Sequence, residues 1–245
     1  MDSEPPLKKR DTQQRETQRT TQHETQHNTT FVDITIGQKR ALSRYFDNFL
    51  DEEESSKLFG ALQSLKDESS NSPNSPIFSK DKYKMFGKEV EAPRFTATFG
   101  VKGTTYTYAG MTRIPTTEWP VELLDCKTKL EAFLGCELNY AFVNYYEGEH
   151  YIGWHSDKEG DIETTPDGQT TIASISLGDE REFQIRPIYR KGEKPTQIYK
   201  KILKNGSLCT MEKHTQSLCK HCVPVKRGST KVRINITFRK MRVNN

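Results

Sequence analysis

The sequence predicts a mainly β protein with flanking helices, an α+β chain in which a β-sandwich or barrel carries helices on its surface. Two observations predict this class. Short segments of alternating apolar and polar residues recur from position 95 to position 240, with turn residues between them. Apolar residues at helical spacing occur in two stretches that begin before position 136. At 245 residues the chain can bury one good core.

Residues 1–30 are expected to form a disordered polar tail, because their Thr, Gln, Arg and His side chains offer little apolar surface to bury. The basic run LKKR at 7–10 is a candidate nuclear-import patch, so we expect a nuclear or otherwise a cytoplasmic location. The start is polar, the five cysteines make no even framework, and no apolar run approaches the roughly 20 residues of a membrane helix. We therefore expect a soluble protein in a reducing compartment, with no membrane partner.

Two helical regions follow the tail. Leu58, Leu62 and Leu65 fall at helical spacing, which predicts one or two helices within 39–67, and NSPNSP at 71–76 predicts a linker after them. A further helix is predicted in WPVELLDCKTKLEAFLG at 119–135. It has a proline near its first turn, a glycine to end it, and three apolar anchors: Leu123, Leu130 and Phe133.

The rest of the chain is predicted to form strands. Their apolar and polar residues alternate, and turns separate them. The predicted strands are FTATFG at 95–100, TYTYAG at 105–110, LNYAFVNYY at 138–146, TIASISL at 171–177, EFQIR at 182–186 and VRINITFRK at 232–240.

Charge is unevenly distributed along the chain. Residues 191–245 contain 14 Lys and Arg against two Asp and Glu, whereas residues 137–190 contain four against 11. An acidic region beside a basic one indicates a cation site next to a surface that meets polyanions. The alternative is that both are simply solvated faces.

A candidate metal site lies in YIGWHSDKEGDI at 151–162. His155 and Asp157 are separated by one residue, so both side chains project to one face of an extended backbone. With a second histidine, either His214 or His221, they would complete the two-histidine, one-carboxylate triad typical of non-haem Fe(II) oxygenases. The alternative for the pair itself is a surface histidine beside an acid.

A second polar pattern lies in RINITFRK. Arg233, Asn235, Thr237 and Arg239 alternate with apolar residues, so one face of the strand is polar with a cation at each end. Two arginines on one face can hold a small dicarboxylate through bidentate hydrogen bonds. The alternative is an amphipathic strand whose polar side faces water.

The C-terminal cysteines allow a competing metal interpretation. A zinc ion could be held by Cys209, His214, Cys219 and Cys222. Their single C-x-x-C pair has no second pair at structural spacing, which favours free thiols instead.

Five segments taken together resemble the AlkB family of Fe(II)- and 2-oxoglutarate-dependent dioxygenases: FVNYYEGEHYIGWHSD, IASISLG, GSLCTM, KHCVP and RINITFRK. The resemblance runs from Phe31 to Met241 and implies a double-stranded β-helix, or jelly roll, over residues 31–245. It implies iron ligands His155, Asp157 and His221, because the family places the distal histidine three residues before the proline of HCVP. The residues it assigns to 2-oxoglutarate are Asn144, Tyr146, Arg233, Asn235, Thr237 and Arg239. Since all three iron ligands are present, a jelly-roll binding module without chemistry is the weaker alternative.

The resemblance also implies a reaction. Members of the family use Fe(II), 2-oxoglutarate and O2 to hydroxylate a methyl group on a base nitrogen, and formaldehyde, succinate and CO2 are released. A base inside a duplex must be flipped out and stacked on aromatic side chains before it can react. Tyr106 and Tyr108 alternate on one strand face and suit that stacking, although two tyrosines in a strand are also compatible with a core position.

Residues 80–113 are expected to form a nucleotide-recognition lid. Met85, Phe86 and Gly87 form an apolar hairpin tip flanked by lysines, the composition of a wedge that enters between base pairs. An ordinary buried hairpin is the alternative. The tip resembles the finger of the family's double-strand DNA-repair subgroup, which implies that Arg94 lines the base pocket and that Glu159 lies near the exocyclic nitrogen of the flipped base.

The implied partner is therefore double-stranded DNA with a flipped methylated base of the 1-methyladenine or 3-methylcytosine type. Single-stranded DNA or RNA remains an alternative substrate. Four lysines of a predicted basic loop would contact the phosphates of the opposite strand: Lys191, Lys194, Lys200 and Lys201. We expect a monomer, and no sliding-clamp contact, because no aromatic residue occurs before Phe31.

Overall fold

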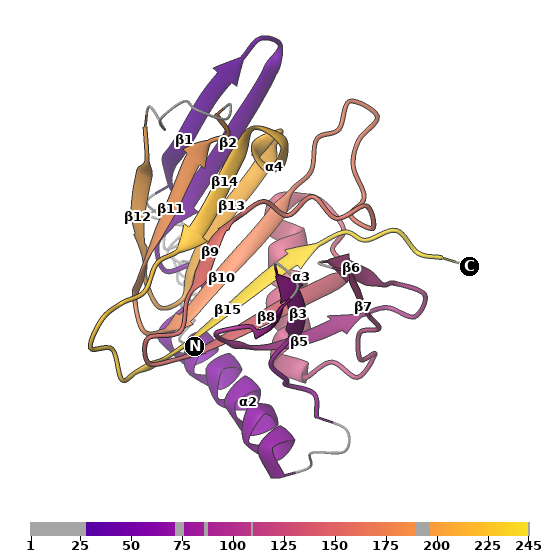
Figure 1. The fold of residues 1–245 in the computed structure, drawn as a ribbon, viewed down its shortest axis with the longest axis vertical. Helices are drawn as coiled ribbons and strands as arrows, with labels where there is room; N and C mark the ends of the chain where they lie inside the picture. Colours follow the sequence, from indigo (N-terminus) through magenta and orange to yellow (C-terminus); the bar gives the residue numbers. More distant parts are fainter. Residues whose placement is uncertain (1–27, 72–75, 86–87, 109, 190–196, 245) are drawn as a thin grey trace, which may run out of the picture.

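The computed structural model describes residues 28–71, 76–85, 88–108, 110–189 and 197–244. Its strands form two main sheets (Figure 1). The larger has seven strands in the order β1 (Asn28–Ile36), β2 (Lys39–Phe46), β13 (Ser207–Lys213), β10 (Ile172–Gly178), β15 (Val232–Arg239), β8 (Tyr140–Glu147) and β5 (Phe95–Gly100). The smaller has four strands in the order β12 (Tyr199–Leu203), β11 (Arg181–Pro187), β14 (Cys219–Val223) and β9 (Ile152–His155).

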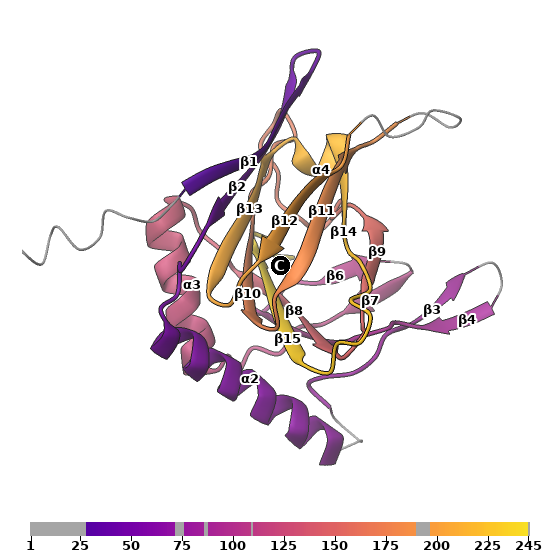
Figure 2. The ribbon, with the colours of Figure 1, turned by 90° about the vertical axis from the view of Figure 1, so that its left-hand side faces the viewer.

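Two small hairpins complete the β structure. They pair β3 (Lys82–Met85) with β4 (Lys88–Glu91), and β6 (Tyr106–Tyr108) with β7 (Met111–Arg113). Each is a separate two-stranded sheet, and both lie on the same side of the barrel in the two ribbon views (Figure 1, Figure 2).

The arrangement of the strands confirms the predicted mainly β class and the jelly roll. The named strand pairs are all antiparallel, and many neighbours in the sheets are distant in sequence, as in β10 between β13 and β15. Apolar side chains from both sheets meet between them, among them Ile172 and Met211 from the larger sheet and Phe183 and Ile185 from the smaller. This shared interior explains why the alternating pattern of the sequence persists through both sheets.

Helices α2 (Glu52–Asn71) and α3 (Val121–Leu134) cover the outer face of the larger sheet (Figure 2). The α2 N-terminus is a capping box: the Glu54 N–H donates to Asp51 Oδ1 and the Asp51 N–H donates to Glu54 Oε2, both at 2.8 Å. The predicted end of α3 is confirmed, since Gly135 takes the left-handed conformation with φ of 65°.

The α3 anchors and the α2 leucines pack as their spacing predicts, with one exception. Leu58, Leu62, Leu123 and Leu130 are buried against the larger sheet. Phe133 remains 41% exposed, although its ring contacts Phe46 and Phe49 edge-on. A third helix, α4 (Thr215–Leu218), is a single turn between β13 and β14.

One predicted element is wrong. The helical region expected to begin at 39 instead starts with strand β2, and only 52–71 is helical. The sequence KRALSRYF buries alternate residues, Ala41, Ser43 and Tyr45, and Gly37 supplies the positive φ of the turn that pairs β2 with β1. A period of two therefore defines this segment, and the leucines further along belong to a separate helix.

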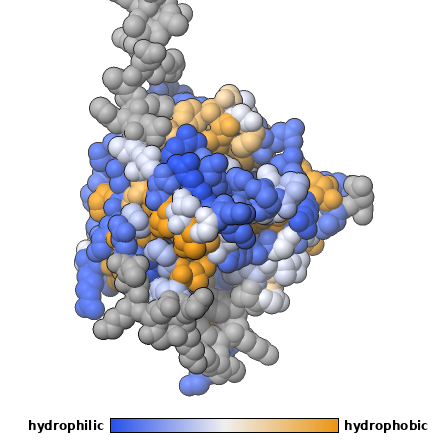
Figure 3. All heavy atoms as spheres, turned by 90° about the horizontal axis from the view of Figure 1, so that it is seen from above, coloured by the Kyte–Doolittle hydropathy of each residue, from blue (hydrophilic) through white to orange (hydrophobic). Residues whose placement is uncertain are grey.

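The structure describes only the end residues of the predicted tail and linker. Residues 28–30 belong to β1, while 1–27, including the LKKR patch, lie outside the described residues. The same is true of 72–75 within NSPNSP. On the face seen in Figure 3, hydrophilic residues separate small hydrophobic patches. Among the described residues, no helix is long and apolar enough to cross a membrane.

Candidate active site

The smaller sheet brings two histidines together. His155 ends β9 and faces His221 on β14 as its cross-strand neighbour, and their ring centroids are 4.2 Å apart. Both rings point into the barrel, because neighbouring residues in a strand pair share a face. Asp157 lies two residues beyond His155, where the chain leaves β9.

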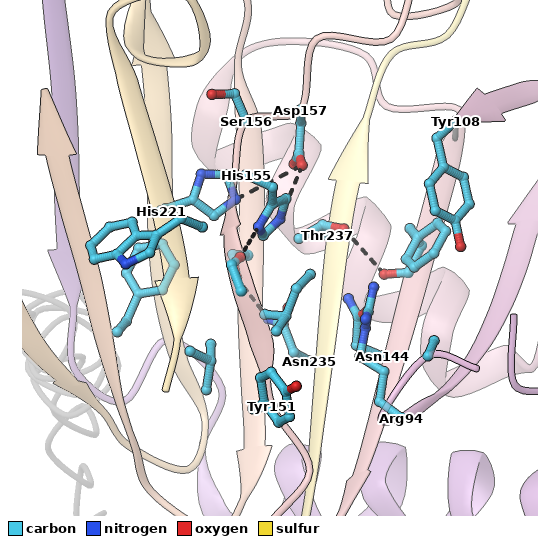
Figure 4. A pocket seen from close by; sticks show the side chains of 18 of the residues that line it. Arg94, Tyr108, Asn144, Tyr151, His155, Ser156, Asp157, His221, Asn235 and Thr237 are labelled. Atoms are coloured by element: carbon cyan, nitrogen blue, oxygen red, sulfur yellow. Dashed lines mark hydrogen bonds and ion pairs between the residues drawn. The ribbon is translucent and has the colours of Figure 1, made fainter. Parts of the chain in front are cut away.

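His155, Asp157 and His221 each offer a ligand atom, and these atoms lie within 4.8 Å of one another. His155 Nε2 is 3.5 Å and His221 Nε2 is 3.8 Å from Asp157 Oδ1, so the three side chains surround one point (Figure 4). His155 Nδ1 lies 2.8 Å from the Gly153 carbonyl oxygen. A proton on Nδ1 would satisfy that carbonyl and leave Nε2 free as a ligand, which is how metal-binding histidines are usually oriented.

Burial keeps both imidazoles neutral. It lowers the pKa of His221 to about 3, with the neighbouring His155 acting in the same direction. Burial also lowers the pKa of His155, although Asp157 partly opposes the change. For Asp157, burial favours the neutral acid, but Arg239 and the two histidines outweigh it and lower the pKa. Two neutral imidazoles and one carboxylate are the protonation states that a divalent metal requires.

Asp157 is held in place through both its carboxylate and its backbone. Its Oδ2 accepts a 3.4 Å hydrogen bond from Arg239 Nη2, and its backbone N–H donates to Gln216 Oε1 at 2.9 Å. Arg239 Nη2 also donates to Thr237 Oγ1 at 2.8 Å. The site therefore links β9, α4 and β15, which are far apart in the sequence.

The polar face of β15 does not face water. Arg233, Asn235, Thr237 and Arg239 are between 1 and 7% exposed, while Ile234, Ile236 and Phe238 pack in the core under the helices. The alternative of a solvated amphipathic strand is thus wrong, because the two faces of β15 point into two different interiors. Asn235 donates to Ser174 Oγ at 2.7 Å and to the Ile175 carbonyl at 2.9 Å.

A cavity of about 470 Å³ opens beside this polar face. Its lining includes the three candidate metal ligands together with Asn144, Tyr146, Asn235, Thr237 and Arg239. Aromatic side chains line another part of it, namely Tyr106, Tyr108 and Phe142, and the Tyr106 ring lies 5.3 Å from Tyr108 and 5.2 Å from Phe142. The cavity therefore has one polar, metal-facing wall and one wall suited to a flat apolar ring.

The chain matches a known protein family over most of its length. The family model of the 2OG-Fe(II) oxygenase superfamily matches residues 43–239, which include every cluster described above. The chain belongs to the 2OG-Fe(II) oxygenase superfamily. It is an AlkB-type oxygenase, so the resemblance seen in the sequence is confirmed. Fe(II), 2-oxoglutarate and O2 are accordingly its cofactor and co-substrates.

Several curated relatives of this 2OG-Fe(II) oxygenase are about one third identical to it. DNA oxidative demethylase ALKBH2 of Homo sapiens is 33% identical over 161 residues, which cover 64% of this chain and 60% of the human protein. The Bos taurus ALKBH2 is also 33% identical, over 64% of this chain and 56% of its own length. The alpha-ketoglutarate-dependent dioxygenase alkB homolog 3 of Bos taurus is 36% identical over 61% and 52%. The matches thus span less than two thirds of these relatives.

A solved structure agrees on the fold. The structure of OsALKBH1 superposes with a TM-score of 0.52 at 19% sequence identity, over 81% of this chain and 97% of that one. At this identity the likeness shows the shared jelly roll and nothing about the substrate.

The buried arginines of this oxygenase fit a carboxylate ligand. Within the described part of the chain, Arg233 Nε and Nη1 have no hydrogen-bond partner, although the side chain is 1% exposed. Its Nη2 donates to Ser176 Oγ at 3.1 Å, and its guanidinium carbon lies 5.0 Å from the centre of the Tyr146 ring. Buried guanidinium donors without an acceptor are costly, and the carboxylate of 2-oxoglutarate would supply one. Arg233 pairs with Tyr146 across β15 and β8 and is not part of the cavity lining, unlike Arg239.

Arg94 and Glu159, predicted to lie near the base, both line the cavity. Arg94 Nε donates to Asn144 Oδ1 at 2.6 Å, so the predicted base-side arginine is bonded to a residue predicted for 2-oxoglutarate (Figure 4). Burial and the nearby Asp157 raise the pKa of Glu159. Its Oε2 has no hydrogen-bond partner among the described residues and lies 3.9 Å from Arg239 Nη1.

The other predicted residues either do not line the cavity or lie outside the described residues. The zinc alternative is not assembled, because among the described residues only His155, Asp157 and His221 bring metal-ligand atoms together. Cys209 Sγ instead lies 3.5 Å from Ser43 Oγ. Of the wedge, the structure describes Met85 as the last residue of β3, whereas Phe86 and Gly87 lie outside the described residues. Of the basic loop it describes Lys200 and Lys201, both on β12, but not Lys191 or Lys194.

Two residues that organise the site were not predicted from the sequence. Ser174, a cavity residue, accepts a hydrogen bond from Asn235, and Gln216 accepts one from Asp157. The alternation of serines in IASISLG was a usable signal for Ser174, because it gives β10 a polar inner face like that of β15. Gln216 lies on the one-turn helix α4, and no pattern in the sequence points to it.

Proposed function

We propose that this chain is an oxidative demethylase that removes methyl groups from ring nitrogens of DNA bases such as 1-methyladenine and 3-methylcytosine. The observation that carries the proposal is the juxtaposition within one cavity of the His155, Asp157 and His221 cluster with a wall of tyrosines. The similarity to proteins named DNA oxidative demethylase supports the same class of substrate.

In this proposal His155, Asp157 and His221 hold Fe(II), and the row from Arg233 to Arg239 with Asn144 and Tyr146 holds 2-oxoglutarate. When bound, the metal with 2-oxoglutarate and O2 supplies the oxidising power that hydroxylates the N-methyl carbon. One oxygen atom of O2 enters the methyl group and the other enters succinate as CO2 leaves. The hydroxymethyl product then breaks its C–N bond and releases formaldehyde and the unmodified base.

The protein's own side chains orient the partners of that reaction. Arg239 bonds to Asp157 and fixes the carboxylate that faces the metal position. Tyr106 and Tyr108 offer ring faces to the flipped base, and Glu159 offers a carboxyl group whose raised pKa allows it to accept or donate a hydrogen bond at the base edge. Arg94, bonded to Asn144, connects this base side with the 2-oxoglutarate side.

We further infer that duplex DNA is the favoured substrate. The β3–β4 hairpin, whose first strand ends at Met85, stands outside the two main sheets, and the sequence predicts an apolar tip at 85–87. Such a tip can fill the space that a flipped base leaves in the stack, while lysines along β12 contact the phosphates of the opposite strand. We propose that the protein acts as a monomer in the nucleus, and the basic run at 7–10 supports that location.

A formaldehyde-release assay tests the proposal. The protein is incubated with matched methylated and unmethylated oligonucleotides, single- and double-stranded, with Fe(II) and 2-oxoglutarate added together or singly. We expect formaldehyde from methylated DNA when both are present, with the duplex preferred. Turnover restricted to RNA or single strands would replace the duplex by those substrates, and no turnover on any nucleic acid would overturn the proposal.

A further inference from the structure

Asp81 is a buried carboxylate that the proposed chemistry does not use. It lies directly before β3 and is 4% exposed. It is not part of the cavity lining, yet its side chain reaches residues that are. Burying a charged group is costly unless it is paired and hydrogen-bonded, so its partners indicate what it stabilises.

Three side chains converge on this carboxylate. Asp81 Oδ2 accepts a hydrogen bond from the Tyr108 hydroxyl and another, at 3.0 Å, from Thr96 Oγ1. Asp81 Oδ1 forms an ion pair with Arg113 Nη2. Arg113 Nη2 also donates to Thr96 Oγ1 at 2.8 Å, which closes a network of four side chains.

The four side chains come from separate parts of the fold. Tyr108 ends β6 and Arg113 ends β7, so both belong to one hairpin, while Thr96 is on β5 at the edge of the larger sheet. The backbone carbonyl of Asp81 also accepts a 2.7 Å hydrogen bond from the Ala92 N–H, which closes the base of the β3–β4 hairpin. Asp81 thereby joins both hairpins to the barrel.

This contact bears on the cavity through Tyr108. Its ring lines the cavity (Figure 4). It meets the Phe142 ring edge-on at 6.2 Å and the Tyr106 ring at 5.3 Å. A hydroxyl held by a carboxylate restricts rotation of the side chain about its Cα–Cβ bond. A stacking surface that is already oriented loses less conformational freedom when a base binds.

We propose that Asp81 is a positioning residue for the substrate: it sets the orientation of Tyr108 and couples the β3–β4 hairpin to the hairpin that stacks on the base. Asp81 does not itself touch the base. This inference rests on the proposed function, because it assigns the aromatic wall to a methylated base. If Asp81 has this role, its substitution should weaken nucleic-acid binding and leave 2-oxoglutarate binding unchanged. A purely structural acid would not produce that difference.

The test compares three variants with a matched control. Tyr108→Phe keeps the ring and removes the hydroxyl, Asp81→Asn keeps the shape and removes the charge, and the third variant combines both. The control is Glu212→Gln, which removes the charge of another half-buried acid. Glu212 on β13 forms an ion pair with Arg44 on β2, with 2.7 Å between Arg44 Nε and Glu212 Oε1. Should Asp81→Asn fail to fold, Tyr108→Phe still tests the orienting contact alone.

Four quantities are measured for each variant. The Kd for a methylated single-stranded oligonucleotide is measured by fluorescence anisotropy with Mn(II) in place of iron. The KM values for the oligonucleotide and for 2-oxoglutarate, and the melting temperature, complete the set. We expect each single variant to raise the oligonucleotide Kd and KM by about fivefold, the loss of one hydrogen bond. The KM for 2-oxoglutarate should stay unchanged, and the double variant should be no worse than Asp81→Asn.

The outcomes distinguish failure of the positioning role of Asp81 from failure of the proposed function. A lower melting temperature with an unchanged oligonucleotide Kd in both single variants would overturn the positioning role and leave Asp81 as a structural acid. Independent, additive effects of the two substitutions would overturn the coupling between them. Failure of the wild-type protein to bind methylated oligonucleotides would overturn the proposed function, and this inference with it.

Discussion

The two walls of the cavity are built in different ways. The metal-facing wall is carried by β8, β9, β14 and β15, whose side chains come from two sheets. All eight β15 residues pair with β8, and His221 on β14 pairs with His155 on β9. The aromatic wall combines Phe142 of β8 with two tyrosines of a three-residue strand, β6, which lies in a hairpin outside both sheets. The network around Asp81 anchors that hairpin to the barrel.

This difference suggests how one fold can keep its chemistry while its substrate changes. The metal ligands and Arg239 cannot move without disturbing sheet registers and the core behind Ile234, Ile236 and Phe238. The hairpins can change their sequence without touching that core. We therefore expect substitutions on the metal-facing wall to affect every substrate alike, and substitutions on the hairpins to change which nucleic acid is used.

The largest effect is expected from removing a metal ligand. His221→Ala should reduce turnover by more than about 100-fold, because losing a ligand should cost more than losing the outer contacts that orient one. His214→Ala is the matched control, since His214 is equally buried but outside the ligand cluster. Calorimetric titration with Mn(II) checks that the loss follows from metal binding. Loss of binding in the control alone would show that the third ligand has been misassigned.

The next effect concerns the co-substrate. Arg233→Lys should raise the KM for 2-oxoglutarate by about tenfold or more, because an ammonium cannot replace the planar fork of a guanidinium. Arg44→Lys serves as the control, since Arg44 forms its ion pair with Glu212 away from the cavity. An unchanged KM in Arg233→Lys would mean that the unpaired Arg233 nitrogens do not meet 2-oxoglutarate.

A change at the hairpin tip should act on one substrate only. Phe86→Ala is expected to reduce the ratio of duplex to single-strand turnover by about tenfold, because flipping a base out of a stack costs a few kcal/mol and the wedge offsets part of it. Its melting temperature should stay near that of the wild type. Val121→Ala, which truncates a residue that is 63% exposed at the start of α3, provides the control. An unchanged ratio would rule out the wedge.

The smallest effect is expected from mild acid. A histidine binds a metal only when its ring is neutral, and burial lowers the pKa of both His155 and His221 from the ordinary value of about 6.5. Mn(II) affinity should therefore change little as the pH falls from about 8 to about 6, and should decline only below that range. A steep loss centred near pH 6.5 would show that the histidines titrate as if exposed.

Local spacing in the sequence grouped part of each wall, including the two tyrosines of β6. His155 and Asp157 are two residues apart, and the four polar residues of β15 alternate within one strand, so a local period was enough to group each set. His221 needed the family pattern, because its place beside His155 depends on a strand pairing 66 positions away along the chain. Local spacing carries no information about such a register.

The Asp81 network shows what local reasoning could not reach. Asp81, Thr96, Tyr108 and Arg113 share no period, and they meet only after two hairpins have folded against β5. The β1–β2 hairpin was missed for a related reason, since the leucines of α2 made the preceding strand look like the start of a helix. In both cases tertiary packing, and not the local pattern, determines the structure.

Anaerobic calorimetric titration of Mn(II)-loaded protein tests the division between the two walls most directly. Wild type, Arg233→Lys and Tyr108→Phe are each titrated with 2-oxoglutarate and then with a methylated oligonucleotide. We predict that Arg233→Lys weakens only 2-oxoglutarate binding and that Tyr108→Phe weakens only oligonucleotide binding. If either variant weakens both ligands to the same extent, the two walls do not have separate roles and the account is contradicted.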